Sequence, residues 1–217
     1  MSKITMADGH KARLSYTNLI EPRAQDSDHP DVKTYSTAIL ISKSDKVLVD
    51  AIKAAIAEAL AEGRAKFGWK GSAGLKNPLR DGDTKEDKNG KLDEVYSGSF
   101  FLNAKGPRGG AEAPVLMDKN ADKTESASVI YPGVEARLSL QFYPFEKSGN
   151  KGVACSVSAV LSLETGEPLG NTVTVESARN EFGVTSTSTT GAAAAEFKNS
   201  EAKPAAAAAV EADPWAE

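Results

Sequence analysis

The sequence predicts a mainly β protein: a small β-barrel of about five strands with one capping α-helix, followed by a disordered tail. Five segments between residues 11 and 163 have the character of strands, and most of them alternate apolar and polar residues. Only residues 44–60 place apolar side chains at helical spacing. From residue 183 onward no apolar periodicity is present, so that stretch cannot offset the entropy of ordering itself.

The first two strands are predicted at residues 11–20 and 34–41, on either side of a polar loop that contains two prolines. Each alternates, so that one side of each strand is apolar and the other polar. Tyr16 and Tyr35 fall on the apolar sides. We therefore expect both rings in the core.

The helix is predicted to begin near Ser44, which suits an N-cap, with Asp45 in the first turn. Gly63 is placed to end it. The apolar positions of the helix form one stripe: Val47, Leu48, Ala51, Ile52, Ala55, Ile56, Ala59 and Leu60. A helix with a single apolar face is expected to lie against the sheet as a lid or plug.

Three further strands are predicted at residues 95–104, 134–145 and 153–163. In the first, alternation forces one of Phe100 and Phe101 inward and the other outward, without indicating which. Five strands and one helix between strands favour an OB-fold. A β-sandwich also fits, because strand number alone does not decide whether a sheet closes.

Composition indicates a soluble intracellular protein. Cys155 is the single cysteine among 217 residues, which excludes a disulfide framework, and no apolar stretch approaches the length of a membrane span. We divide the chain into a domain at residues 1–182 and a tail at residues 183–217. The tail carries five acidic and two basic side chains, so most of the formal net charge of −4 lies there and the domain is nearly neutral. That balance argues against a protein coated in positive charge, but not against a local basic groove.

The segment from residue 63 to residue 80 is the first candidate binding site, because it contains five basic side chains and no acidic one. Two aromatic residues are interleaved with these cations, an arrangement that suits a single-strand binder: cations follow phosphates and rings stack on bases. An alternative is a surface loop whose aromatic rings pack back onto the barrel. The candidate residues are Arg64, Lys66, Phe67, Trp69, Lys70, Lys76 and Arg80.

Weaker candidates lie elsewhere in the domain. Lys105 and Arg108 form a second basic patch, which is also explained as a solvated loop. Arg137 and Tyr143 are predicted on the outward side of their strand, and Arg13 on the outward side of the first strand. These residues are candidates for contacts with DNA.

Catalytic and metal chemistry is poorly supported. His10, His29 and Cys155 are isolated from one another in sequence, so we expect no metal site and no cofactor. Asp81 and Asp83 suggest a calcium loop or a nuclease, but their segment does not have the EF-hand spacing and is better explained as a solvated turn. No nucleophile elbow or phosphate-binding glycine loop is present, so we expect a protein that is not an enzyme.

Several segments, taken in order, resemble one protein family. They are residues 14–22 (LSYTNLIEP), 35–41 (YSTAILI), 77–83 (NPLRDGD), 98–105 (GSFFLNAK), 130–133 (IYPG) and 152–153 (GV). The series resembles the single-stranded DNA-binding proteins of tailed phages, which have an OB-fold. The resemblance implies binding of single-stranded DNA without sequence specificity, during phage replication or recombination in the host cytoplasm.

The tail is similar in kind to the acidic tails of bacterial and phage single-strand binders. Its candidate partner-binding residues are Glu211, Asp213, Trp215 and Glu217. The resemblance implies that this tip recruits replication or recombination proteins, and we also expect it to compete with DNA for the basic groove. In the family pattern the aromatic residue is the last one, whereas here Ala216 and Glu217 follow Trp215. A homo-oligomer is compatible with the sequence, and the rival hypothesis is a virion structural or scaffold protein with a β-barrel module.

Overall fold

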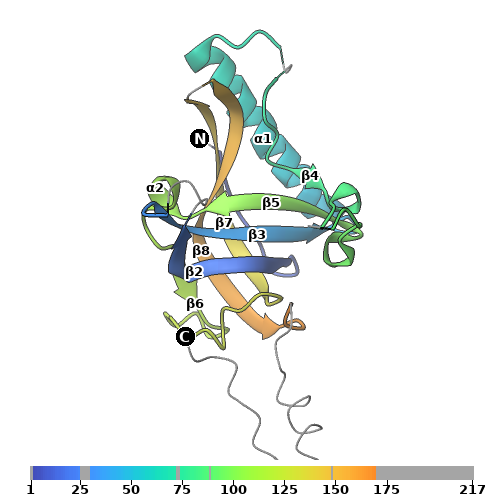
Figure 1. Ribbon diagram of the computed structural model, residues 1–217, viewed down its shortest axis with the longest axis vertical. Coiled ribbons are helices and arrows are strands. Elements are labelled where there is room, and N and C mark those ends of the chain that lie inside the picture. The colour runs from blue at the N-terminus through green and yellow to red at the C-terminus, as the bar shows by residue number, and fades with distance from the viewer. Residues whose placement is uncertain (1, 25–29, 72–73, 88, 148, 170–217) are drawn as a thin grey trace, which may run out of the picture. The chain divides into compact units, whose positions relative to one another are not determined.

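The computed structural model describes residues 2–24, 30–71, 74–87, 89–147 and 149–169 (Figure 1). Five long strands form a closed ring in the order β7-β2-β3-β5-β8, and β8 pairs back with β7. Their bounds are β2 Ala12–Ala24, β3 Lys33–Ser42, β5 Ser99–Lys105, β7 Glu135–Lys147 and β8 Asn150–Thr165. The ring confirms the predicted small OB-fold-like barrel, because a closed ring is not a sandwich of two sheets.

All pairings around the ring are antiparallel except the one between β5 and β8, which joins Ala104 and Lys105 to Cys155 and Ser156. Three short strands extend the sheet at its edges: β1 Ser2–Thr5 pairs with β7, β4 Arg80–Asp81 with β5, and β6 Val115–Met117 with β8. Sequence patterning missed these strands because two to four residues are too few to show alternation.

The predicted strand at residues 95–104 starts later than expected. Residues Glu94–Tyr96 form a short 3₁₀ helix, η2, because the Asp93 carboxylate accepts a hydrogen bond from the backbone N–H of Val95. A second 3₁₀ helix, η1, covers Gly82–Thr84, and a single helical turn, α2, covers Pro107–Gly110. These turns lie at the two ends of β5.

The main helix, α1, runs from Lys46 to Phe67 and is therefore longer than predicted at its C-terminal end. Asp45, not Ser44, is the N-cap, because its carboxylate accepts from the N–H of Leu48 at 3.1 Å. The prediction that Gly63 ends the helix is wrong. The left-handed residue at the C-cap is Gly68, with φ 68°, and its N–H bonds to the carbonyl oxygen of Arg64.

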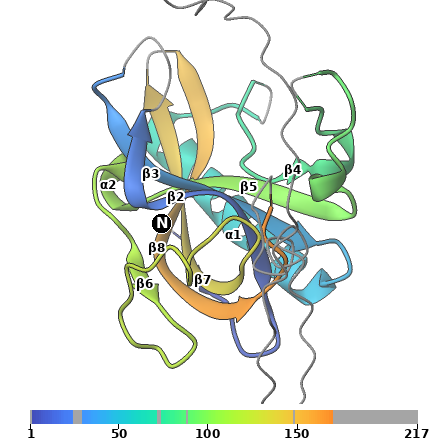
Figure 2. The same ribbon diagram turned by 60° about the horizontal axis from the view of Figure 1, so that its bottom comes forward.

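The core fills the barrel and extends to the apolar side of α1. Figure 2 shows the curved strands of the barrel with α1 behind them. The buried helix residues Leu48, Val49, Ile52, Ala55, Ile56 and Ala59 belong to the same cluster as Leu14, Ile39, Leu102, Leu140 and Phe142 of the strands. The predicted lid over the barrel is therefore confirmed.

A β-bulge interrupts β2 between Ser15 and Asn18, where three steps along β2 match two steps along β3. Leu14 and Leu19 are both buried although they are five residues apart, which requires the bulge to change the phase of the alternation. The prediction that Tyr16 lies in the core is consequently wrong, and its side chain is 62% exposed. Tyr35 is half-buried.

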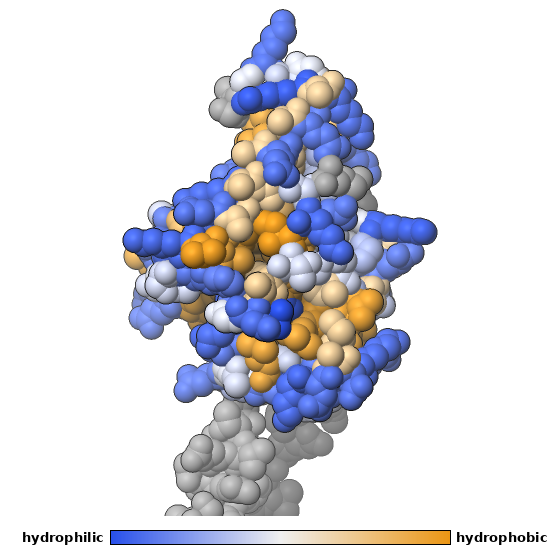
Figure 3. Space-filling model, turned by 180° about the vertical axis from the view of Figure 1, so that it is seen from behind, coloured by the Kyte–Doolittle hydropathy of each residue, from blue (hydrophilic) through white to orange (hydrophobic). Residues whose placement is uncertain are grey.

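In Figure 1, β2, β3 and β5 lie in front of β7 and β8, so their outer side faces the viewer. Figure 3 shows the opposite side of the molecule, where apolar atoms gather over the middle and hydrophilic side chains surround them. No helix among the described residues is long and apolar enough to cross a bilayer.

Candidate nucleic-acid interface

The outer side of β2, β3 and β5 forms a shallow polar surface that we call the sheet face. Across β3 and β5, Ser36 lies opposite Lys105, and Ala38 lies opposite Asn103. All four side chains line a hollow of about 440 Å³. Its other lining residues include Tyr16, Asn18 and Arg23 of β2. The hollow thus combines a ring, amide groups and cations on one side of the sheet.

Tyr16 is the most exposed aromatic residue described on this surface. Its backbone has φ 50°, in the left-handed region that a bulky side chain rarely adopts. Such a conformation costs free energy and persists where the surrounding structure imposes it, often at a functional site. Here the β2 bulge imposes it and turns the ring toward solvent.

An aromatic cluster continues the sheet face toward β4. Leu40, Tyr96 and Phe101 are buried together, and the rings of Tyr96 and Phe101 meet edge to face at 5.1 Å. Cations cover this cluster: the guanidinium of Arg80 lies 4.3 Å from the Phe101 ring centre, and the amine of Lys85 lies 3.9 Å from that of Tyr96. Phe101 is thus the outward member of the Phe100–Phe101 pair, whereas Phe100 packs against the main core.

Lys85 is oriented by a carboxylate. Its amine bonds Asp93 at 2.9 Å. Burial lowers the pKa of this amine, but Asp93 and the neighbouring hydroxyls of Tyr96 and Tyr16 raise it, and the net shift is upward. Lys85 therefore stays charged, paired with Asp93 and close to the hydroxyls of Tyr96 and Tyr16.

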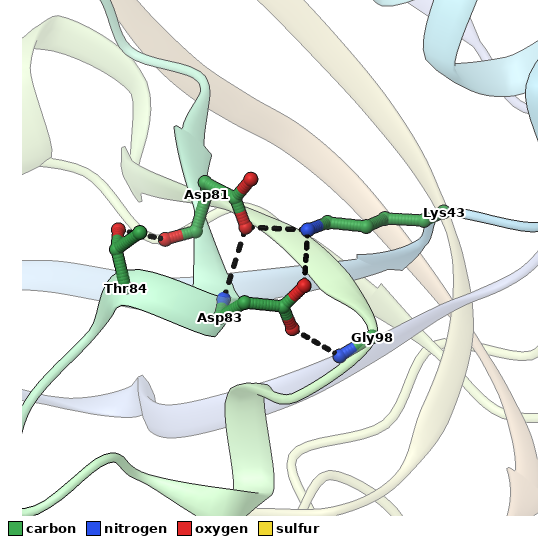
Figure 4. A network of polar contacts seen from close by, with 5 residues as sticks. All are labelled: Lys43, Asp81, Asp83, Thr84 and Gly98. Carbon is green, nitrogen blue, oxygen red and sulfur yellow. Dashed lines mark hydrogen bonds and ion pairs between the residues drawn. The ribbon is translucent and has the colours of Figure 1, made fainter.

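Asp81 and Asp83 anchor the loop that carries Tyr96 of this aromatic cluster (Figure 4). The Lys43 amine donates to both carboxylates, at 2.5 and 2.6 Å, and Asp83 also accepts from the N–H of Gly98 at 2.6 Å. The Lys43 hydrogen bonds lower the pKa of both acids. Both acids therefore have a structural explanation, as holders of the turn at Gly82. Within the described part of the chain, no three His, Cys, Asp or Glu side chains are grouped to hold a metal.

This network predicts an acid-sensitive anchor. Because the folded-state pKa values of Asp81 and Asp83 lie below the ordinary 3.8, their contribution to stability is complete above about pH 4 and lost as the pH falls through the folded-state values. We expect Lys43→Met to lose less stability than the wild type between about pH 6 and pH 3. Thermal unfolding at several pH values measures this difference. An exposed neighbour, Lys46→Met, serves as the control, and an unchanged pH dependence in Lys43→Met would contradict the assignment.

The residues of the basic segment lie in two places. Arg80 is on the sheet face, whereas Arg64, Lys66, Lys70 and Lys76 are exposed near the C-terminal end of α1 and the β7–β8 hairpin, which we call the helix end. In Figure 1 the C-terminal end of α1 and the β7–β8 hairpin both lie at the top of the molecule. Lys76 forms a bridge to Gly152 in β8, which ties this segment to the hairpin.

Trp69 is buried at the helix end, so this ring packs on the protein and is not displayed for stacking on bases. Its indole N–H donates to the carboxylate of Glu146 at 2.7 Å, and Phe67 stacks on it at 5.4 Å between ring centres. Gly63 makes room for the ring, because a Cβ there would lie 2.7 Å from Cε3 and Cη2 of Trp69 and closer still to Cζ3. The alternative interpretation, in which this ring packs back, is the one that the structure favours for Trp69.

The remaining candidates differ in availability. Arg137 donates to the carbonyl oxygen of Met6 and pairs with Asp8, so it ties β7 to the N-terminal segment. Arg13 similarly donates to the carbonyl oxygens of Gly133 and Glu167. Tyr143 is half-buried, and burial raises the pKa of its hydroxyl. Arg108 is exposed on α2, beside Lys105, and pairs with Glu112 at 3.2 Å.

Cys155 is buried in the barrel, which raises the pKa of its thiol to about 12 and suits a core residue. Glu211, Asp213, Trp215 and Glu217 of the tail lie outside the described residues.

Sequence reasoning missed Tyr16, Asn18, Arg23 and Lys85 as members of the site. Tyr16 was misassigned because strict alternation was extended through a bulge that has no glycine or proline to mark it. A usable signal was present in the spacing of Leu14 and Leu19, which cannot share one side of a regular strand.

Comparison with known protein families identifies the family to which the chain belongs. The model of the family described as "Enterobacter phage Enc34, ssDNA-binding protein" matches residues 5–192. The chain belongs to this family. The resemblance drawn from the ordered motifs is confirmed, and it is favoured over the virion-structural alternative. Among curated protein sequences, none matches the chain significantly.

Solved structures agree on the fold. The single-stranded DNA-binding protein of bacteriophage Enc34, in complex with ssDNA, superposes with a TM-score of 0.58 at 18% identity, over 78% of this chain and 90% of that one. The single-stranded DNA-binding protein encoded by bacteriophage T7 superposes with a TM-score of 0.50 at 16% identity, over 80% of this chain and 98% of that one. At such identities the likeness extends to the fold alone.

Proposed function

We propose that this protein binds single-stranded DNA without sequence specificity, in phage replication or recombination in the host cytoplasm. The family relationship supports the ligand class. The sheet face supports the mode of binding, because it places an exposed ring and several cations along one continuous surface. The single observation that carries the proposal is the outward, strained Tyr16 beside Lys85 and the hollow.

The proposed path runs along β5, from β4 to α2. Phosphates meet cations placed along it, and bases stack on Tyr16. Stacking and phosphate contacts tolerate any base, which is why we propose binding without sequence preference. The cations of this path are Arg23, Arg80, Lys85, Lys105 and Arg108.

The helix end is proposed as a secondary contact. Arg64, Lys66, Lys70 and Lys76 are exposed there, and the half-buried ring of Phe67 lies under the Lys66 amine at 5.3 Å. Trp69 and Arg137 lie outside the proposed contacts. Trp69 is buried, and Arg137 is held by two hydrogen bonds to the carbonyl oxygen of Met6. Tyr143 of β7 is a half-buried neighbour of the helix end.

The test is an anisotropy titration of labelled oligo-dT at several salt concentrations. Five phosphate contacts on the sheet face predict a log–log salt slope of about −3.5, at about −0.7 for each contact on a single strand. We expect Arg80→Gln to make the slope less negative by about 0.7, and the control Lys3→Gln, on β1, to leave it unchanged. Arg64→Gln measures the share of the helix end. Absence of salt-sensitive binding at micromolar protein would refute the function.

We propose that the protein acts by binding alone. Asp81 and Asp83 are both engaged by Lys43, which leaves the nuclease alternative without a free pair of carboxylates at this turn. Incubating labelled single strands with magnesium tests this point, and specific cleavage would contradict it. A homo-oligomer remains part of the proposal, to be measured by light scattering with and without DNA.

We further propose that the acidic tip, with Glu211, Asp213, Trp215 and Glu217, recruits replication or recombination proteins and competes with DNA for the cationic surface. The tail from residue 183 has a net charge of −3, whereas the domain is close to neutral. Deleting residues 205–217 is expected to tighten binding to oligo-dT at low salt and to weaken pull-down of a replication partner. An unchanged affinity at low salt would contradict the competition.

A further inference from the structure

A second hollow lies beyond Tyr16, on the side away from β5. It has a volume of about 700 Å³, within the roughly 300–1,000 Å³ of small-molecule sites. One wall is β2, and the other is the loop before β7 with Ala127, Ile130, Tyr131 and Pro132. Tyr16, Asn18 and Arg23 line both this hollow and the one on the sheet face, so the two hollows are neighbours that share this border.

We infer that this second hollow is a base pocket, which takes one unstacked base of the strand that lies on the sheet face. This inference rests on the proposed function. It names a binding site beyond the barrel strands and a specific occupant, a single nucleotide base that passes over Tyr16.

The lining favours a base over a phosphate. Its apolar lining includes Ile20, Pro22 and Pro132 above the buried Ile130, and its rings come from Tyr16 and Tyr131. Among the described lining residues, Arg23 is the one cation and Glu21 the one carboxylate, so their charges offset each other. A phosphate gains little there, whereas a neutral, flat base gains apolar contact and stacking.

The pocket is also preorganised. The Tyr131 hydroxyl donates to the carbonyl oxygen of Gly166 at 2.9 Å, which holds that ring in place. Ile130 is buried in the main core, and the N–H of Gly133 bonds the carbonyl oxygen of Leu14 at 2.7 Å. The loop that lines the hollow is thus attached to β2. A base that enters the hollow would therefore meet a surface that is already ordered before binding.

The experiment uses the full chain and the shortest oligo-dT that binds with full affinity, since that length fixes the register. One abasic nucleotide is moved along the oligonucleotide. We expect one position at which loss of the base weakens binding by roughly 5- to 150-fold, the equivalent of about 1–3 kcal/mol for one stacked base. No position-specific loss in the wild type would overturn the inference without any variant.

Ala127→Trp provides the matching variant, because Ala127 is exposed and its side chain borders the hollow. A ring there fills the pocket, so we expect weaker binding of the intact oligonucleotide by the same factor and no further loss at the sensitive abasic position. Ala127→Ser and Ala57→Trp, the latter on the exposed side of α1, are the controls. Equal or tighter binding by a folded Ala127→Trp would overturn the pocket. Failure of the wild type to bind oligo-dT would instead overturn the proposed function.

Discussion

Replacing Tyr16 with alanine is expected to weaken binding of oligo-dT by roughly 5- to 150-fold, because stacking of one base on an aromatic side chain contributes about 1–3 kcal/mol. The ring stands between the two hollows and is 62% exposed, so its removal costs little core packing. Anisotropy titration at fixed salt measures the change. The salt slope should stay the same, because no phosphate contact is removed.

Matched variants separate stacking from other effects of this substitution. Tyr16→Phe keeps the ring and should bind nearly as the wild type does. Val115→Ala removes an exposed apolar side chain on β6, away from both hollows, and should leave affinity unchanged. Wild-type affinity in Tyr16→Ala would show that the strand does not pass over this ring.

Replacing Gly63 with alanine is expected to destabilise the fold, although alanine in a helix ordinarily gains about 1 kcal/mol over glycine. The new Cβ would occupy space filled by the Trp69 ring, which must then leave its place against α1. Overpacking of this kind costs about 1–3 kcal/mol, which equals or exceeds the propensity gain. The ring would also lose its hydrogen bond to Glu146. Chemical denaturation measures the loss in stability.

A double-mutant cycle identifies the cause. In a Trp69→Ala background no ring opposes the new Cβ, so Gly63→Ala should be neutral or stabilising. A Trp215→Phe background leaves Trp69 as the remaining tryptophan, and its emission should shift to the red when Gly63→Ala exposes it. Stabilisation by Gly63→Ala in the otherwise unchanged protein would contradict the packing described here.

Much of the fold was predictable from local pattern. The alternation of residues 134–145 and 153–163 places Phe142 and Val157 in the core, and the structure buries both. The helical stripe from Leu48 to Ala59 likewise identified the side of α1 that packs on the barrel. Errors arose at the ends of elements, because a cap is a single residue. Ser44 is as suitable an N-cap by residue type as Asp45, and Gly63 is as suitable a C-cap as Gly68.

The candidate site was less predictable. Clustering of cations in sequence pointed to residues 64–80, yet the chain turns within that segment and separates Arg80 from Arg64. Conversely, Arg23, Lys85 and Lys105 are far apart in sequence and come to one surface because β2, β3 and β5 are neighbours. Pairing between strands is long-range, so no local pattern reveals it.

The sequence by itself determined the class of fold, the helix that covers the barrel and the family, because each depends on periodicity or on the order of motifs along the chain. Only the tertiary structure decided which aromatic rings are available. The bulge in β2 turns Tyr16 outward, and the missing side chain at Gly63 lets Trp69 pack inward. Both outcomes depend on which atoms meet across distant segments, and residue type alone does not encode that.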